Sequence, residues 1–268
     1  MCSSRQSAVR RLSVASLAVG ALLAIAGIDS WNAFAMTPGT FSEADRAARE
    51  RARLVAEIEQ DVLETSHYLG TQRLDPRVIS AIGSVPRERF VPAGLRHQAY
   101  GNHPLPIGRG QTISQPYIVA VMSHLLRLPP DGGRVFELGT GSGYQAAVLG
   151  AMGAEVYSVE IVPDLAASAA EALSEFGYDR VHVRAGDGYL GWPDAAPFDG
   201  IIVTAAGPEI PQPLDDQLKV GGRLVMPLGP IHRTQELVVL TKQADGSLGR
   251  REVLPVRFVP ITGNAVGD

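Results

Sequence analysis

The sequence predicts an α/β fold in which helices cover both faces of a mainly parallel, doubly wound sheet. Two observations support this class. From residue 134 onward, short apolar and β-branched runs alternate with stretches of helical periodicity, as in a chain that crosses a parallel sheet repeatedly. The first of these runs, at 135–138, leads into a turn with glycines at alternate positions and then into an alanine-rich helical stretch. A buried strand, a glycine turn and a helix in this order are typical of a nucleotide-binding unit.

The remaining elements of the sheet follow in chain order. Five strands with three helices between them are expected from periodicity and from the positions of glycine and proline. The strands are at 135–138, 156–160, 181–184, 200–204 and 223–227, and the helices are at 144–152, 165–176 and 214–218. Two further extended segments, at 236–241 and 252–258, are separated by the turn residues Asp245 and Gly246. A connection this short predicts an antiparallel hairpin at one edge of the sheet.

The part of the chain before this core has the pattern of helices. Residues 36–116 are expected to form a helical appendage that ends in a loop, and residues 117–268 the core. Ser42 and Asp45 stand three residues apart before a helical pattern, which predicts a capping box at the start of a long helix. Asp75, followed by a proline, predicts the start of a second helix.

A polar, glycine-rich loop at 104–116 precedes the core. It runs into an apolar helix, and Ser114 stands where the N-cap of that helix is expected, two residues before Pro116. Capping is therefore one role open to Ser114. Gln111 and Thr112 add further hydrogen-bonding side chains close to the same helix start.

The first 35 residues have the layout of a secretory signal peptide. Three arginines precede an apolar run at 12–28, and an Ala-Phe-Ala sequence at 33–35 supplies a cleavage site before Met36. We therefore expect a mature domain at 36–268 that is periplasmic or secreted and not attached to a membrane. An uncleaved membrane anchor or a misplaced start codon would produce the same pattern.

Composition excludes several functional classes. The chain has 268 residues, 45% of them hydrophobic, which is enough to bury a full core. Its formal net charge of −4 gives no indication of a nucleic-acid partner. Cys2 is the only cysteine, so an internal disulfide and a cysteine-ligated metal are excluded. The six histidines lack the spacing of metal ligands, and we expect no metal site.

The glycine turn has the pattern E-x-G-x-G-x-G, formed by Glu137, Gly139, Gly141 and Gly143. A dinucleotide-binding turn requires its third glycine one position later, where this chain has Tyr144. An acidic side chain beside the turn disfavours a pyrophosphate and favours a cationic ligand. S-adenosylmethionine carries a sulfonium and an ammonium and no phosphate, so a methyltransferase is the favoured interpretation.

Further acids stand at the ends of the next two strands. Glu160 lies about twenty residues past the glycine turn, where a carboxylate can accept hydrogen bonds from both ribose hydroxyls. Asp187 can accept from an adenine amino group, and Gly188 beside it lets the ring lie close. For each acid alone, a solvated carboxylate at a strand end is the competing interpretation.

At this point the chain resembles the protein-L-isoaspartate (D-aspartate) O-methyltransferase family over roughly residues 57–262. The matching words are VPRERFV at 85–91, LPIGRGQTISQP at 105–116, ELGTGSGYQ at 137–145, GDG at 186–188, FDGIIVTAAGPEIPQP at 198–213, LKVGGRLVMPLG at 218–229 and RFVP at 257–260. The specific stretch is QTISQP, because the glycine turn alone indicates only a Rossmann-like methyltransferase.

The resemblance implies a Rossmann-like class I methyltransferase fold and a repair activity. The family transfers a methyl group from S-adenosyl-L-methionine to the free α-carboxylate of L-isoaspartyl residues, and less readily to D-aspartyl residues, in damaged proteins. Ser114 then takes the catalytic position, and we expect a monomer that acts on damaged proteins or peptides. The expected cofactor-binding residues are Thr112, Ile113, Glu137, Gly139, Gly141, Gly143, Glu160, Asp187 and Gly188.

Some alternatives remain at this stage. A methyltransferase for another carboxylate or a small molecule would share the core, although the segment 111–116 disfavours it. A non-catalytic nucleotide-binding protein or a nicotinamide-dependent oxidoreductase would belong to a different class. The family usually lacks a signal and works in the cytoplasm, so the segment 1–35 is a departure from its pattern and leaves a cytoplasmic location open.

Overall fold

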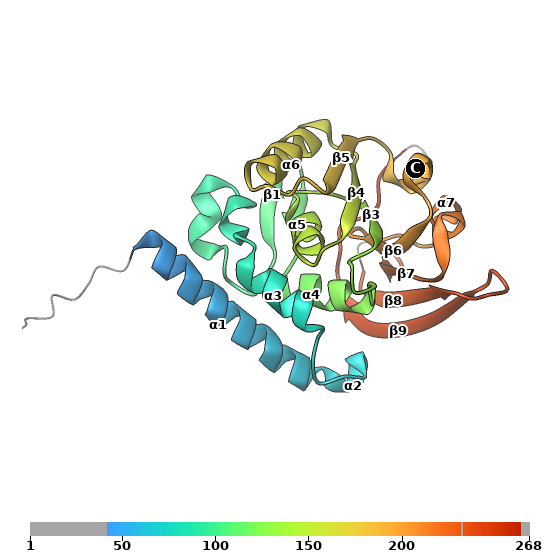
Figure 1. The fold of residues 1–268 in the computed structure, drawn as a ribbon, viewed down its shortest axis with the longest axis horizontal. Helices are drawn as coiled ribbons and strands as arrows, with labels where there is room; N and C mark the ends of the chain where they lie inside the picture. Colours follow the sequence, from blue (N-terminus) through green and yellow to red (C-terminus); the bar gives the residue numbers. More distant parts are fainter. Residues whose placement is uncertain (1–41, 232, 264–268) are drawn as a thin grey trace, which may run out of the picture. The chain divides into compact units, whose positions relative to one another are not determined.

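The computed structural model describes residues 42–231 and 233–263 (Figure 1). These residues belong to one folded unit, Phe41–Asp268. The predicted signal peptide at 1–35 lies outside the described residues.

The centre of the fold is a seven-stranded sheet with the order β5-β4-β3-β6-β7-β8-β9 (Figure 1). The strands are β3 (Arg134–Leu138), β4 (Glu155–Glu160), β5 (Val181–Ala185), β6 (Phe198–Val203), β7 (Leu218–Leu228), β8 (Gln235–Lys242) and β9 (Leu248–Val256). Neighbours from β5 to β7 pair in parallel, whereas β8 is antiparallel to both β7 and β9. The predicted parallel core and C-terminal antiparallel hairpin are therefore confirmed. The order of the sheet reverses between β3 and β6, which is where ligands bind in such sheets.

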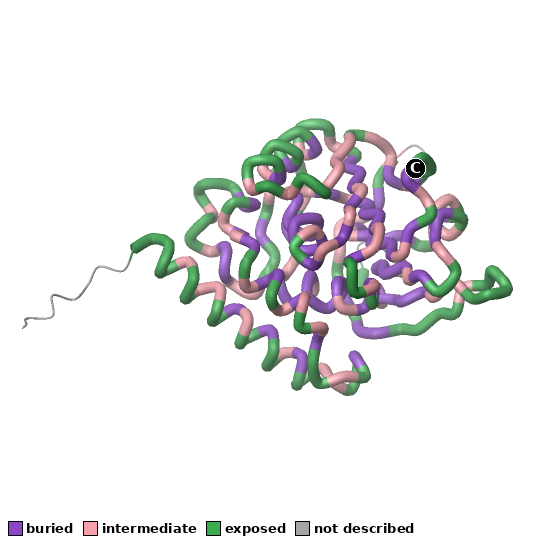
Figure 2. The backbone as a smooth tube through the Cα atoms, viewed as in Figure 1, coloured by how far each residue is buried: buried purple, intermediate pink, exposed green. Residues whose placement is uncertain are grey.

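Each face of the sheet has its own hydrophobic core, and the alternation of side chains along β3 separates them. Val135 packs into one core with helices α4 (Pro116–Leu125), α5 (Tyr144–Ala151) and α6 (Pro163–Glu175). Phe136 and Leu138 point to the other face and pack with Leu214 of the short helix α7 (Gln212–Asp216). Figure 2 shows buried chain in the interior of the fold and exposed chain along its outer helical turns and loops. Helices cover both faces, as predicted, but α7 and two 3₁₀ turns, Gly188–Leu190 and Pro193–Ala195, provide the helical cover of the second face.

The N-terminal helices pack into the first of these cores. Helix α1 (Glu43–Glu64) begins at the predicted capping box, in which Ser42 Oγ accepts from the Asp45 N–H at 3.1 Å and Asp45 accepts from the Ser42 N–H at 3.2 Å. The buried side chains of α1 are Leu54, Ile58 and Val62, which repeat every four residues and therefore share one face. After the short α2 (Ser66–Leu69), helix α3 (Pro76–Ser84) begins at Asp75 as predicted.

The segment at 104–116 differs from the predicted loop. It forms a β-hairpin of β1 (Leu105–Gly108) and β2 (Gln111–Ile113), closed by Arg109 and Gly110 in the left-handed region. Ser114 follows β2 directly and is not the N-cap of α4. That position belongs to Gln115, whose side chain makes no capping bond. The proline at the first position of α4 has no N–H, so one backbone donor fewer needs a hydrogen-bond partner at the start of the helix.

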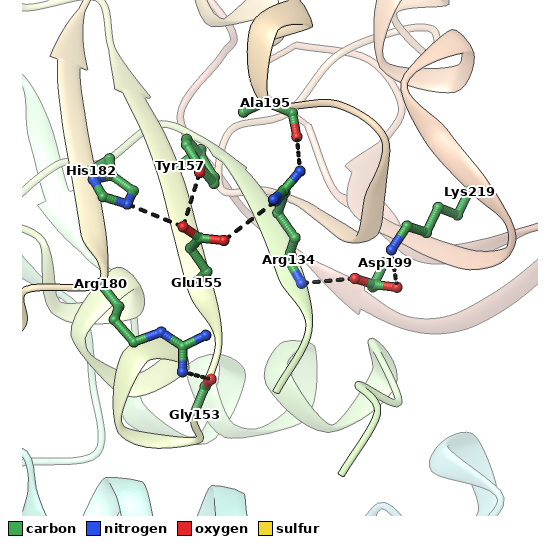
Figure 3. Close-up of polar contacts among 9 residues, drawn as sticks. All are labelled: Arg134, Gly153, Glu155, Tyr157, Arg180, His182, Ala195, Asp199 and Lys219. Carbon is green, nitrogen blue, oxygen red and sulfur yellow. Dashed lines mark hydrogen bonds and ion pairs between the residues drawn. The ribbon is translucent and has the colours of Figure 1, made fainter. Parts of the chain in front are cut away.

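A polar network fastens the amino ends of the parallel strands (Figure 3). Asp199 accepts from the Arg134 N–H at 2.8 Å and from Lys219 Nζ at 2.7 Å, which ties β3, β6 and β7 together. The Arg134 side chain reaches Glu155 of β4 at 3.4 Å, and Glu155 lies 3.6 Å from His182 of β5. Charged side chains therefore hold the end of the sheet that lies away from the glycine turn.

Candidate active site

The glycine turn leaves β3 where the sheet order reverses. Gly139 has φ of 95°, in the left-handed region, and a Cβ added there would lie 2.5 Å from Thr204 Oγ1. The Thr204 hydroxyl lies 3.0 Å from the Leu138 carbonyl and 2.7 Å from the Gly139 carbonyl and donates toward them. A side chain at position 139 would displace this hydroxyl, so glycine is required for the contact between the turn and the end of β6.

Glu137 lies beneath the turn and has no exposed surface. Its Oε2 accepts from Ser158 Oγ at 2.5 Å, and Ser158 Oγ lies 2.5 Å from Thr140 Oγ1 in the turn. Burial raises the pKa of Glu137 to about 8; the Ser158 hydrogen bond opposes the shift and the charge of Glu160 adds to it. Glu137 lines none of the cavities beside the turn. It contacts the turn indirectly, through the hydroxyls of Ser158 and Thr140.

Glu160 ends β4 and connects it to the glycine turn. One carboxylate oxygen accepts from the Gly141 N–H at 2.8 Å, and the other accepts from the Val162 N–H at 3.0 Å. The side chain lines a narrow cavity of about 50 Å³ together with Gly139 and Gly141. Each carboxylate oxygen has a second lone pair, so both can accept another hydrogen bond from a ligand.

Gly188 lines this narrow cavity, and Asp187 precedes it in the chain. Asp187 Oδ1 accepts from the Tyr189 N–H at 3.0 Å and caps a 3₁₀ turn, and it is not among the lining residues. Gly188 lines the cavity, and a Cβ there would lie 2.7 Å from Leu138 Cγ. The requirement for glycine at 188 therefore comes from β3 as well as from any ligand.

The end of the β1–β2 hairpin joins the turn to a larger cavity. Thr112 and Ser114 line a cavity of about 410 Å³ beside Phe258, and both also line a pocket of about 40 Å³ against Gly139 and the start of α5. Ile113, between them, is buried and lines only the smaller pocket. Gly143 lines none of these spaces; it precedes α5 and packs against Leu173.

Two parts of the site were not expected from the sequence as binding elements. Thr204 lines all three cavities, and the C-terminal segment at 259–262 lines the narrow one beside Glu160. Backbone bonds hold that segment in place: the Ala206 N–H donates to the Val259 carbonyl at 2.7 Å, and the Ile261 N–H donates to the Ala206 carbonyl at 2.8 Å. The RFVP sequence at 257–260, which matches the family, was the sequence feature that could have indicated this segment. Its role depends on its contact with the end of β6, which the sequence alone does not show.

The two cavities differ in charge. Among the described residues that line the narrow cavity, Glu160 is the one charged side chain. Among those that line the 410 Å³ cavity, Arg257 is the one charged side chain. By its charge, the first cavity favours a cationic group, such as the sulfonium of S-adenosylmethionine, over a pyrophosphate, whereas the second favours an anionic group. Within the described residues, no group of three or more His, Cys, Asp or Glu side chains could hold a metal ion.

The parallel sheet, the glycine turn at its switch point and the strand-end carboxylates define a class I methyltransferase. The profile of the protein-L-isoaspartate (D-aspartate) O-methyltransferase family matches residues 59–266, and the chain belongs to this family.

Individual relatives agree with the family match. A protein-L-isoaspartate O-methyltransferase 2 of Syntrophobacter fumaroxidans is 55% identical over 213 residues, which cover 80% of this chain and 86% of the relative. A solved protein-L-isoaspartate O-methyltransferase is 29% identical with a TM-score of 0.69, covering 80% of this chain and 66% of that one. A Plasmodium falciparum structure in complex with S-adenosyl-L-homocysteine shares the fold, with a TM-score of 0.63 and 23% identity over 78% of this chain and 98% of that one.

Proposed function

We propose that this chain is a protein repair methyltransferase that moves a methyl group from S-adenosyl-L-methionine to the free α-carboxylate of L-isoaspartyl, and less readily D-aspartyl, residues in damaged proteins. Family membership and the names of the relatives support the reaction, and the bound S-adenosyl-L-homocysteine in the Plasmodium falciparum structure supports the cofactor. The single observation that carries the proposal in this chain is the division of charge: a narrow cavity with Glu160 adjoins a larger one with Arg257.

When bound, the cofactor supplies an electrophilic methyl group on a sulfonium. Glu160 and the glycine turn would hold it, with Thr112 and Ile113 from the hairpin and with Asp187 and Gly188 at the adenine end. Glu137 would contribute from beneath the turn, through Ser158 and Thr140.

The residues on the substrate side have to align and partly desolvate a carboxylate. A carboxylate is ionised at neutral pH and needs no strong general base to attack. No carboxylate or histidine is found among the described residues that line the 410 Å³ cavity, in agreement with a reaction that needs none. Ser114 would donate a hydrogen bond that fixes the direction of attack, and Arg257 would attract the substrate charge.

Ser114→Ala tests the role of Ser114. We expect kcat for an isoaspartyl peptide to fall at least tenfold, since an orienting hydrogen bond is lost, while the dissociation constant of S-adenosylmethionine changes by less than about twofold. Ser168→Ala, at an exposed position on α6, is the matched control. Unchanged turnover in S114A would remove Ser114 from catalysis.

The substrate is tested separately with the unmodified enzyme. A peptide with one isoaspartyl residue should be methylated, and the same peptide with a normal aspartyl residue should not. Methylation of neither peptide by a protein that binds S-adenosylmethionine would indicate a methyltransferase for another substrate.

We also propose that residues 1–35 are a cleaved export signal, that residues 36–268 are the mature domain, and that this domain is a monomer. The composition of the first 35 residues supports export. Of the helices in the described part of the chain, none is long and apolar enough to cross a membrane. Cell fractionation with N-terminal sequencing tests the signal, because an intact Met1 in the soluble cytoplasm would refute it. Light scattering after size exclusion tests the monomer.

A further inference from the structure

Arg87 is a buried arginine outside the cavities already described. It begins the 3₁₀ turn Arg87–Arg89 and has no exposed surface. Its Nε donates to the Ala99 carbonyl at 2.9 Å and its Nη2 donates to the Ser114 carbonyl at 2.9 Å. The guanidinium carbon lies 4.7 Å from the centre of the Tyr144 ring, at the start of α5.

This guanidinium lacks the partner that usually accompanies a buried charge. It forms no ion pair with any carboxylate in the described residues, and its Nη1 makes no hydrogen bond of normal geometry there, with the neutral Tyr144 hydroxyl as its polar neighbour. Burial lowers the pKa of Arg87 to about 10, so it remains charged at neutral pH. Burying an uncompensated charge is unfavourable for folding, which means that stability alone does not account for an arginine at this position.

The contacts of Arg87 connect the substrate side and the cofactor side of the site. Its bond to Ser114 fixes the backbone just after β2, where the chain passes between the large cavity and the glycine turn. The Ser114 carbonyl is directed to the buried guanidinium, while the residue also lines both cavities. The Tyr144 ring, which packs on the same guanidinium, belongs to the helix that follows the turn.

We infer that Arg87 is a positioning residue for methyl transfer, which holds the Ser114 backbone at the distance and angle from the glycine turn that the reaction needs. The inference rests on the proposed role of Ser114. Arg87 lines none of the three cavities of the site and acts through two carbonyls and an aromatic ring.

Arg87→Lys is the test, because lysine keeps the charge but cannot reach two carbonyls with separate nitrogens of a rigid fork. Arg89→Lys is the matched control, since Arg89 is in the same turn, is exposed and packs on Phe176. We expect R87K to lower kcat for an isoaspartyl peptide at least tenfold and to change the dissociation constant of S-adenosylmethionine by less than twofold. R89K should change neither.

A double-mutant cycle separates positioning from general weakening of the fold. If Arg87 works through Ser114, the double variant R87K/S114A should be no more than twofold slower than S114A alone. The inference would be overturned if the fold-decreases in kcat of R87K and S114A multiplied in the double variant, or if kcat were unchanged in R87K. Thermal unfolding shows whether R87K is folded at the assay temperature. If R87K is unfolded there, Arg87→Gln, which removes the buried charge, is used in its place.

Hydrogen exchange gives an answer that does not depend on the reaction. Amides in residues 111–115 should exchange at least tenfold faster in R87K than in R89K, because the Ser114 carbonyl loses its anchor. Equal exchange in the two variants would refute the anchoring role. Should the unmodified protein methylate no isoaspartyl peptide, the proposed function fails, and the exchange measurement still decides whether Arg87 holds this segment.

Discussion

Glu137→Gln should change how the stability of the protein depends on pH. Glu137 is fully buried, one of its oxygens has no hydrogen-bond partner among the described residues, and burial raises its pKa from 4.5 to about 8. The folded state therefore retains a proton on Glu137 at pH values where the unfolded chain has released it. Glutamine has nearly the same shape and is neutral at every pH.

The linkage between proton binding and folding gives the sign and the size of this change in stability with pH. A carboxyl group whose pKa is raised by folding contributes its full stability below its unfolded pKa of 4.5 and loses it as pH rises through about 8. Each pKa unit corresponds to about 1.4 kcal/mol, so the wild-type chain loses on the order of 4 kcal/mol from this group between pH 5 and pH 8. The E137Q chain has no such loss. If the glutamine amide interacts less well with Ser158 than the carboxyl group does, the free energy of unfolding of E137Q falls by the same amount at every pH. Its dependence on pH is then unchanged.

Urea unfolding of both chains at pH 5, 6, 7 and 8 measures this difference. The free energy of unfolding of E137Q minus that of wild type should rise by about 1.4 kcal/mol per pH unit over this range. Glu59→Gln, at an exposed position on α1, is the control and should run parallel to wild type. A difference between E137Q and wild type that stays constant within about 0.5 kcal/mol, roughly the error of such measurements, would mean that Glu137 is not held protonated by its burial.

Three further substitutions test other parts of the structure. Glu160→Ala removes the carboxylate from the narrow cavity and should weaken S-adenosylmethionine at least tenfold by calorimetry; an unchanged dissociation constant would exclude the ribose contact. Gly139→Ala places a Cβ 2.5 Å from Thr204 Oγ1 at a φ of 95° and should lower the free energy of unfolding by about 2 kcal/mol, whereas a loss below 0.5 kcal/mol would show that the turn can adjust. Asp199→Asn weakens the network at the amino ends of the strands and should cost about 1–2 kcal/mol of stability in urea without changing cofactor affinity; weaker cofactor binding would contradict the separation of the two ends.

The sequence predicted those features that depend on local chemistry. The capping box of Ser42 and Asp45 and the N-cap at Asp75 were identified because their hydrogen bonds join residues two or three apart. The strands and helices of the core follow from periodicity, which reports directly on burial. The glycine turn was identifiable because its spacing records a backbone requirement.

Contacts between distant segments were not predictable in the same way. The hairpin at 105–113 and the position of Ser114 outside the helix cap depend on partners elsewhere, among them Arg87, 27 residues away. The importance of Thr204 emerges only when β6 lies beside β3 and its hydroxyl meets the turn. Asp187 and Glu137 were expected as cofactor contacts from their places at strand ends. Glu137 is fully buried beneath the turn, and neither carboxylate is among those that line the narrow cavity, so their direct contact with a cofactor is part of the proposed function.

The two ends of the sheet carry charge in different ways, and this difference bears on binding. At the amino ends, Asp199 and Glu155 are matched by nearby cations, so their charges are neutralised within the protein. At the carboxyl ends, Glu160 accepts hydrogen bonds from backbone N–H groups and Glu137 accepts one from a hydroxyl. Neither has an ion-pair partner among the described residues. Burial, together with the charge of Glu160, raises the pKa of Glu137 to about 8, so Glu137 retains a proton at neutral pH and Glu160 is the charged member of the pair. A cation placed at the glycine turn is attracted by the Glu160 carboxylate, and an anion is repelled by it. The fold therefore leaves the Glu160 carboxylate without an ion-pair partner beside the glycine turn, and this charge favours a sulfonium over a pyrophosphate.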